Sequence, residues 1–242
     1  MTSITKIAFA CAALVAASGA FAQKAGDNIV SAGMAYISPR AELGKTTTTS
    51  SDPTSAGYFN NALSNATANV GPAYTVSASW LHMYSDNIGT EVTIGIPPKF
   101  TQDLNTSTSH PAAAQMNILT PAVVAKYFFG TTQDQWRPYL GLGVTHVSFN
   151  NVVMNTADTT VAALAATSAS FTSSWAPVYN LGAIYNIDDK WSVNGSIAYM
   201  PIKTTATFNG PGSPLLGSHA VTTTGDVKLN ATDFVVRLGY RF

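Results

Sequence analysis

The last ten residues restrict the fold of this chain more than any other stretch. From Asp233 to Phe242 the sequence reads DFVVRLGYRF. Side chains of a β-strand alternate between two faces, so this stretch has one apolar face and one face with all its charges. The apolar face comprises Phe234, Val236, Leu238, Tyr240 and Phe242. A strand at the end of a chain needs a partner on each edge, and a closed barrel provides it by pairing the last strand with the first.

The N-terminal residues predict export. Lys6 precedes an apolar run that is followed by the small-x-small sequence Ala20-Phe21-Ala22. This pattern is typical of a secretory signal peptide and predicts cleavage after Ala22. Residues 1–22 are therefore expected to be a signal peptide and residues 23–242 a single barrel domain. The only cysteine, Cys11, lies in the predicted signal peptide, so the mature chain is expected to lack disulfides and thiol chemistry.

The composition favours a membrane barrel. Only 10% of the residues are charged, with 12 basic against 12 acidic side chains, whereas about 25% are charged in an average globular protein. This balance gives no indication of a nucleic-acid partner. No apolar run after the signal peptide is as long as a membrane-spanning helix. The pattern predicts a transmembrane β-barrel, and a secreted β-sandwich is the soluble alternative.

Alternating hydrophobicity predicts eight antiparallel strands joined in turn by long and short connections. Short turns are expected at residues 85–89, 130–135 and 186–190, and long loops at 40–72, 97–117, 150–170 and 202–226, the third with a helical stretch at 160–166. This asymmetry is typical of outer-membrane barrels, which have short periplasmic turns and long extracellular loops. The predicted strands are residues 28–39, 73–84, 90–96, 118–129, 136–149, 174–185, 191–201 and 233–242.

Charged side chains within the predicted strands fall opposite the apolar faces. A Lys or Arg facing lipid near the bilayer midplane costs about 2–4 kcal/mol, so these side chains are expected to line the lumen. We expect Glu91, Lys126 and Arg137 at a similar height near the periplasmic end, and Asp233 and Arg237 further up. They are interpreted either as a polar plug or selectivity ring, or as buried charges that pair inside a narrow lumen.

Four motifs resemble the outer membrane protein W (OmpW) family. They are Tyr127-Phe128-Phe129-Gly130, the block WRPYLGLG at 136–143, Asp86-Asn87-Ile88-Gly89 and the ending LGYRF at 238–242. The resemblance implies an eight-stranded barrel in the outer membrane of a Gram-negative bacterium. It also implies a narrow, rather apolar lumen that passes small hydrophobic molecules. The ending resembles the signal that the barrel-assembly machinery reads, which would involve Leu238, Tyr240 and Phe242.

One departure from the family concerns the constriction of the lumen. Family barrels are described with bulky apolar side chains on the third and seventh strands. The matching inward positions here are Thr93 and Ala198, which are small. Asn194 is a further inward, lumen-lining position on the seventh strand. We therefore hypothesise that the lumen is closed elsewhere, with Met200 as the candidate.

No motif predicts catalysis, a cofactor or a metal. His82, His110, His146 and His219 have no metal-ligand spacing. His146 alone is expected on the lipid-facing side, near Ser148, and a polar residue at the rim explains it better than a lipid hydrolase. We therefore expect a passive channel for small, hydrophobic molecules, in contact with outer-membrane lipid and the barrel-assembly machinery. The alternative is a structural or surface-binding barrel, adhesin-like or receptor-like, with a closed lumen.

Overall fold

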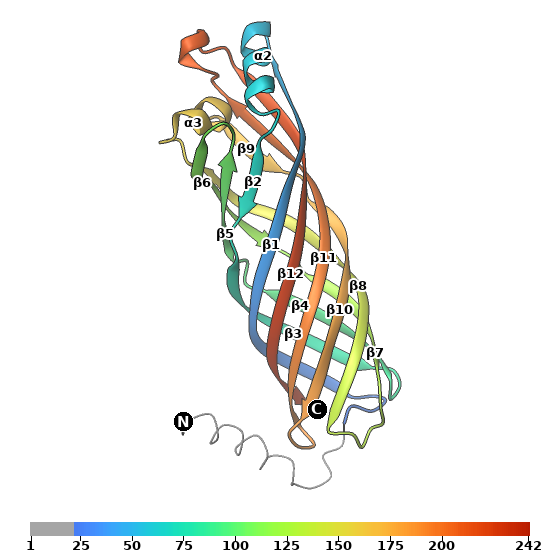
Figure 1. Cartoon of the computed structure of the whole chain (residues 1–242). Coiled ribbons are helices and arrows are strands. Elements are labelled where there is room, and N and C mark those ends of the chain that lie inside the picture. Colours follow the sequence, from blue (N-terminus) through green and yellow to red (C-terminus); the bar gives the residue numbers. More distant parts are fainter. Residues whose placement is uncertain (1–21) are drawn as a thin grey trace, which may run out of the picture.

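Eight antiparallel strands form a closed ring in the computed structural model, which describes residues 22–242 (Figure 1). The predicted signal peptide, apart from Ala22, lies outside the described residues. This ring confirms the predicted fold class. In order around the barrel, its strands are β1 (Asn28–Ser50), β3 (Ala73–Met83), β4 (Ile88–Gly95), β7 (Ala122–Phe128), β8 (Trp136–Met154), β10 (Ser174–Asn186), β11 (Trp191–Gly210) and β12 (Val221–Arg241).

The ring closes where β1 pairs with β12. The register runs from Ile29 opposite Arg241 to Ser50 opposite Val221, with one bulge between Leu43 and Thr46. The predicted pairing of the first and last strands is therefore confirmed. It extends well past both predicted strands, because β1 continues through the Thr-rich segment and β12 begins at Val221.

The barrel has two different ends, which we name the turn end and the loop end. At the turn end, short connections join β3 to β4, β7 to β8 and β10 to β11, as predicted. The C-terminus lies there too (Figure 1). The loop end carries the short elements, namely α2 (Pro53–Ala62), β2 (Thr67–Val70), β5 (Lys99–Asn105), β6 (Ser109–Leu119), α3 (Thr159–Ala165), β9 (Ser168–Phe171) and the 3₁₀ turn η1 (Pro214–Leu216).

The prediction of four long loops was wrong in large part. Most of those residues continue the barrel wall as strands, with β5 and β6 forming a hairpin that joins β2 and β8. Threonine is β-branched and suits an extended backbone, so a Thr-rich segment is compatible with a strand. Helix α3 confirms the predicted helical stretch at 160–166 to within one residue at each end.

The predicted strand 118–129 is in fact broken. Strand β6 ends at Leu119 and β7 starts at Ala122, on either side of Thr120 and Pro121. Pro121 has no N–H to offer a ladder, and its carbonyl accepts hydrogen bonds from the amide of His146 at 3.1 Å and from Oγ1 of Thr145 at 2.9 Å. The proline therefore ends one strand and lets the wall redirect into the hairpin.

The outer face of the turn-end half of the barrel is apolar. Its aliphatic side chains named below are between 42% and 61% exposed, which fits contact with hydrocarbon rather than water. Rings gather near the two edges of this band, for example Tyr36 against Tyr74 at 4.9 Å and Trp191 against Tyr240 at 5.0 Å between centroids. The band includes Met34, Val76, Val92, Ile94, Val123, Leu140, Leu142, Val144, Leu181, Ile197, Val236 and Leu238. Among residues 22–242, no helix has the length and apolarity needed to cross a membrane.

Candidate functional site

A buried cluster of charges crosses the barrel interior. The carboxylate of Glu91 on β4 lies 2.9 Å from Nζ of Lys126 on β7 and 3.5 Å from a guanidinium nitrogen of Arg237 on β12. These three side chains are each no more than 6% exposed. Thr93 and Ser77 complete the cluster, since Thr93 donates to Glu91 at 3.2 Å and Arg237 donates to Ser77 at 3.0 Å. We call this set the ionic layer.

Arg137 does not join the ionic layer, which corrects the predicted arrangement. It is the second residue of β8, and it donates to the carbonyls of Gln23 and Asp86, both at 2.6 Å, and of Phe129 at 3.3 Å. Arg237, expected further up, takes its place beside Glu91. Barrel strands are tilted and staggered, so distance in sequence from a turn does not give the height of a side chain in the barrel.

Tyr139 fills the interior between the ionic layer and the turn end. Lys126 lies 4.2 Å from the centroid of its ring, and its hydroxyl donates to Oδ1 of Asn194 at 2.9 Å. Gly182 makes room for it, because a Cβ there would come within 2.5 Å of the tyrosine hydroxyl oxygen. Below it the interior is packed with apolar side chains, which include Ile29, Leu81, Met83, Phe128 and Ile184.

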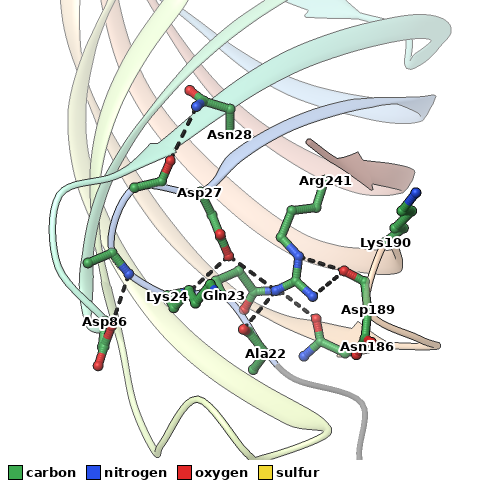
Figure 2. Close-up of polar contacts among 12 residues, drawn as sticks. Ala22, Gln23, Lys24, Asp27, Asn28, Asp86, Asn186, Asp189, Lys190 and Arg241 are labelled. Atoms are coloured by element: carbon green, nitrogen blue, oxygen red, sulfur yellow. Dashed lines mark hydrogen bonds and ion pairs between the residues drawn. The ribbon is translucent and has the colours of Figure 1, made fainter.

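The N-terminal residues of the described chain fold into the turn end. Gln23 is 1% exposed and donates to Asn186 at 2.6 Å. Figure 2 shows the guanidinium of Arg241 between Asp189, Ala22 and Asp27, with its bonds to Ala22 and Asp27 at 2.8 and 3.1 Å. Together with Arg137, these contacts fill the mouth of the barrel with polar groups.

A small cavity adjoins the ionic layer on its other side. Its volume is about 80 Å³, and Thr93, Ala198, Met200, Asp233 and Arg237 are among the residues that line it. Oδ1 of Asp233 has no hydrogen-bond partner there. Met200 is 4% exposed and also belongs to the apolar cluster above. Thr93 and Ala198 thus border free space, and Met200 lies where that space meets the apolar cluster.

Above this cavity the interior is mainly apolar as far as the loop end, and the buried Thr145 and Thr204 donate to backbone carbonyls there. The cluster that contains Met200 also includes Phe100, Met116, Ile118, Val124, Val147, Val178, Ile202 and Leu229. A second cavity, of about 60 Å³, follows at the loop end between β5, β6, β11, β12 and α3. We call it the loop-end cavity. Its lining includes Leu43, Leu63, Leu104, Ala114, Met154, Val161, Leu164, Phe171, Ala206, Phe208 and Val227.

A polar contact holds α3 over the loop-end cavity. Nδ1 of His110 on β6 lies 2.8 Å from Oδ2 of Asp158, the residue that caps α3. Oδ1 of Asp158 accepts from the amides of Thr160 and Val161 at 2.9 and 3.1 Å. Burial raises the pKa of the Asp158 carboxyl, but the His110 contact and the amide hydrogen bonds outweigh this effect, so its pKa is lowered overall. In the sequence His110 is noted only as a histidine without metal-ligand spacing, and its contact with Asp158 was not predicted, since the two residues are 48 positions apart.

The remaining predicted residues lie on strands of the barrel wall, except Phe242, which directly follows β12. Asn194 is buried beside Tyr139. Leu238 and Phe242 are 49% and 68% exposed on the outer face, and Tyr240 contacts Trp191 there. Their role as an assembly signal stays a prediction. The interior roles of Ser77, Tyr139 and Gln23 were not predicted from the sequence. The alternation of side chains places Ser77 and Tyr139 on inward faces and could have indicated their roles. Gln23 precedes the first strand, so no alternation applies to it.

Known proteins that are similar to this chain are outer-membrane proteins. The OmpW family model matches residues 24–242. Outer membrane protein W of Salmonella typhi is 29% identical over 244 residues, which cover 100% of each chain. Outer membrane protein AlkL of Ectopseudomonas oleovorans is 26% identical over 74% of this chain and 69% of that protein. The crystal structure of OprG from Pseudomonas aeruginosa has the same fold, with a TM-score of 0.76, 23% identity, and coverage of 91% of this chain and 98% of that one. The chain therefore belongs to the OmpW family of outer-membrane β-barrel proteins.

Proposed function

We propose that this barrel is a passive conduit for small hydrophobic molecules, which enter through the loop-end cavity. In an outer-membrane barrel the long loops face the cell exterior, so the loop end is the extracellular end. The observation that carries the proposal is the apolar lining of this cavity, from Leu43 on β1 to Leu164 on α3 and Phe208 on β11. An apolar interior at the water-exposed end of the barrel offers favourable burial only to an apolar guest.

The size of the cavity indicates that side chains must move during passage. At about 60 Å³ it is smaller than the roughly 150 Å³ cavity that is known to hold benzene. Met154, Leu164 and Phe208 border it. The flexible thioether of Met154 can adjust its shape at low cost. We therefore propose that the guest widens the cavity by changing the rotamers of these side chains.

The runner-up function is a structural or surface-binding barrel with a closed lumen. The ionic layer favours it, because Glu91, Lys126 and Arg237 pair inside the barrel. The polar contacts of Arg137 and Gln23 at the periplasmic end favour it as well. In this alternative, hydrophobic molecules would not reach the interior, and the loops would carry the binding activity.

The test fills the loop-end cavity with a larger side chain and leaves the outer surface of the barrel unchanged. Ala206 is 1% exposed and lines the cavity, so Ala206→Phe is expected to lower uptake of a fluorescent hydrophobic probe by Gram-negative cells about tenfold, which corresponds to about 1.4 kcal/mol. The matched control is Thr205→Phe, because Thr205 precedes it on β11 and faces outward. Unchanged uptake in a folded Ala206→Phe barrel would refute the conduit and favour the runner-up.

A further inference from the structure

Three cations occur together on the outer wall just above the apolar band. The strands β1, β12 and β11 are adjacent in the barrel. In the described part of each, every outward residue between the turn end and Tyr36, Phe234 or Tyr199, respectively, is uncharged. The next charged side chains above them are Arg40, Glu42, Lys228 and Lys203. On β3, β4, β7, β8 and β10 themselves, no outward residue at this edge is charged in the described part of the chain, and Lys99, the first residue of β5, is an exposed single cation beyond the end of β4.

The register places these cations side by side. Lys228 on β12 is the direct partner of Glu42 on β1 and of Lys203 on β11. Arg40 lies two residues below Glu42, opposite Asn230. Three cations against one carboxylate leave a net charge of +2 on this patch. We name Arg40, Glu42, Lys203 and Lys228 the cationic patch.

The patch is only partly compensated by carboxylates, namely Glu42 within it and Asp226 in the next outward row. Two lysines that face each other directly across strands are destabilising unless a negative charge lies between them. The only carboxylate in the patch, Glu42, is 3.7 Å from Lys228, and both of these side chains are more than 60% exposed. An exposed pair of this kind contributes little. An external anion that binds between Lys203 and its cross-strand partner Lys228 would therefore reduce the repulsion between their charges.

The height of the patch matches that of lipid headgroups. Arg40 lies four residues beyond Tyr36, and Lys203 lies four residues beyond Tyr199. Four residues span about 13 Å along a strand. For a strand tilted by about 40°, this corresponds to about 10 Å along the membrane normal. The headgroup region beyond the hydrocarbon is about 5–8 Å thick on each side. The backbone of these residues thus lies just beyond the headgroup region, and their long side chains can reach back to phosphate groups within it.

A polar wall continues above the patch on the same strands. Thr47, Thr224, Thr207 and Ser170 form one outward row across β1, β12, β11 and β9, and Thr49, Thr222, Asn209 and Ser168 form the next. Asp226 lies between the patch and these rows, where Thr205 donates to it at 3.1 Å. Hydroxyl and amide groups in regular rows suit the hydroxyl groups of a saccharide, while the cations suit phosphate.

We propose that this wall binds the phosphorylated saccharide headgroup of a lipid in the outer leaflet. Arg40, Lys203 and Lys228 contact the phosphate, and the outward threonines of β1, β11 and β12 contact the sugar. The acyl chains of the same lipid then lie along the apolar band below, against Met34, Tyr36 and Phe234. The site is independent of the conduit, since it is on the opposite side of the wall from the loop-end cavity.

The test uses the full chain purified in detergent and titrated with a bisphosphorylated disaccharide lipid, with bound lipid counted by native mass spectrometry. The variant Arg40→Gln/Lys203→Gln/Lys228→Gln is expected to bind about a hundredfold more weakly, because each cation near an anionic headgroup contributes about fivefold. Glu42→Gln should bind more tightly than the parent, which a purely structural role would not produce. The matched control for Lys203→Gln/Lys228→Gln is Lys24→Gln/Lys190→Gln, which removes the same charge from exposed positions at the turn end and should bind as the parent does.

Three outcomes would overturn the proposal. The first is equal binding by the patch variant and its control. The second is equal binding of the dephosphorylated lipid, since the cations would then have no role. The third is full competition by inorganic phosphate at equal concentration, which would identify a free-anion site instead of a lipid site. Circular dichroism of each variant verifies that the barrel is folded, and uptake of the hydrophobic probe should be unchanged in all of them.

Discussion

The membrane half and the extracellular half of this barrel share the same strands, but their outer faces differ in polarity, and the buried ion pairs lie in the membrane half. In the membrane half, Val236 and Leu142 face outward and Glu91, Lys126 and Arg237 face inward. In the extracellular half, Lys228 and Thr224 of the same β12 face outward, whereas Val227 and Leu229 face inward. The backbone pairing of β1 with β12 continues through both halves.

The difference follows from the solvent on the outside. Lipid demands an apolar outer face, so the charged side chains of the strands lie inside and pair in the ionic layer, next to the apolar cluster of Leu81, Phe128 and Ile184. Water outside permits polar outward residues, so the interior can be apolar as in a soluble protein. In the conduit that we propose, a hydrophobic molecule that arrives from outside would meet an apolar interior first and the ionic layer below it.

The largest effect is expected from breaking the ionic layer. Glu91→Gln leaves Lys126 and Arg237 buried without a carboxylate, and the expected loss is about 3–5 kcal/mol of unfolding free energy. Glu42→Gln removes one partner of an exposed pair and should cost less than about 1 kcal/mol. Urea unfolding in lipid vesicles measures both. Similar losses for the two variants would mean that burial does not distinguish the halves.

A lysine scan along the outward face of β12 tests the boundary between the halves. Val236→Lys places a charge on the 61% exposed apolar band and is expected to cost about 2–4 kcal/mol. Thr224→Lys lies on the same face twelve positions earlier in the chain, where water is outside, and should change stability by no more than about 0.5 kcal/mol. Equal costs in the same unfolding assay would contradict the assignment of lipid and water to the two halves.

The smallest effect concerns the contact that holds α3. Because the pKa of Asp158 is lowered in the folded protein, its stabilising contribution is complete above the ordinary pKa of about 3.9 and declines as the pH falls through the lower folded value. Hydrogen exchange of the Val161 amide, corrected for its intrinsic rate, should show this loss below about pH 4. Asp158→Ala should cost about 1 kcal/mol and remove that pH dependence; a variant that kept it would contradict the role of Asp158.

The membrane half was predictable because lipid enforces alternation. Its strands have apolar residues at most outward positions, as from Phe234 to Leu238. In the extracellular half, small inward residues such as Ala206 and Gly225 alternate with outward threonines, and this contrast is too weak to distinguish a strand from a loop. The Thr-rich loops were therefore predicted where strands occur.

The interior faces were predictable, but the partners across the barrel were not. Parity placed Glu91, Lys126 and Arg237 on the inward side, and all three are buried there. The choice between Arg137 and Arg237 as the partner of Glu91 depends on the stagger of the strands, which no local pattern encodes. The same limit applies to His110 and Asp158, which meet only because the β5–β6 hairpin folds against α3.

The most direct test of the account is methyl NMR of the barrel in lipid nanodiscs with a small fluorinated hydrophobic ligand. We predict contacts between the ligand and the methyl groups of Ala114, Leu164 and Ala206, which line the loop-end cavity. The methyl group of Ile184, below the ionic layer, should be unaffected at first contact. Contacts confined to outward methyl groups such as those of Leu142 and Val236 would contradict the account, because the ligand would then only partition into the surrounding lipid.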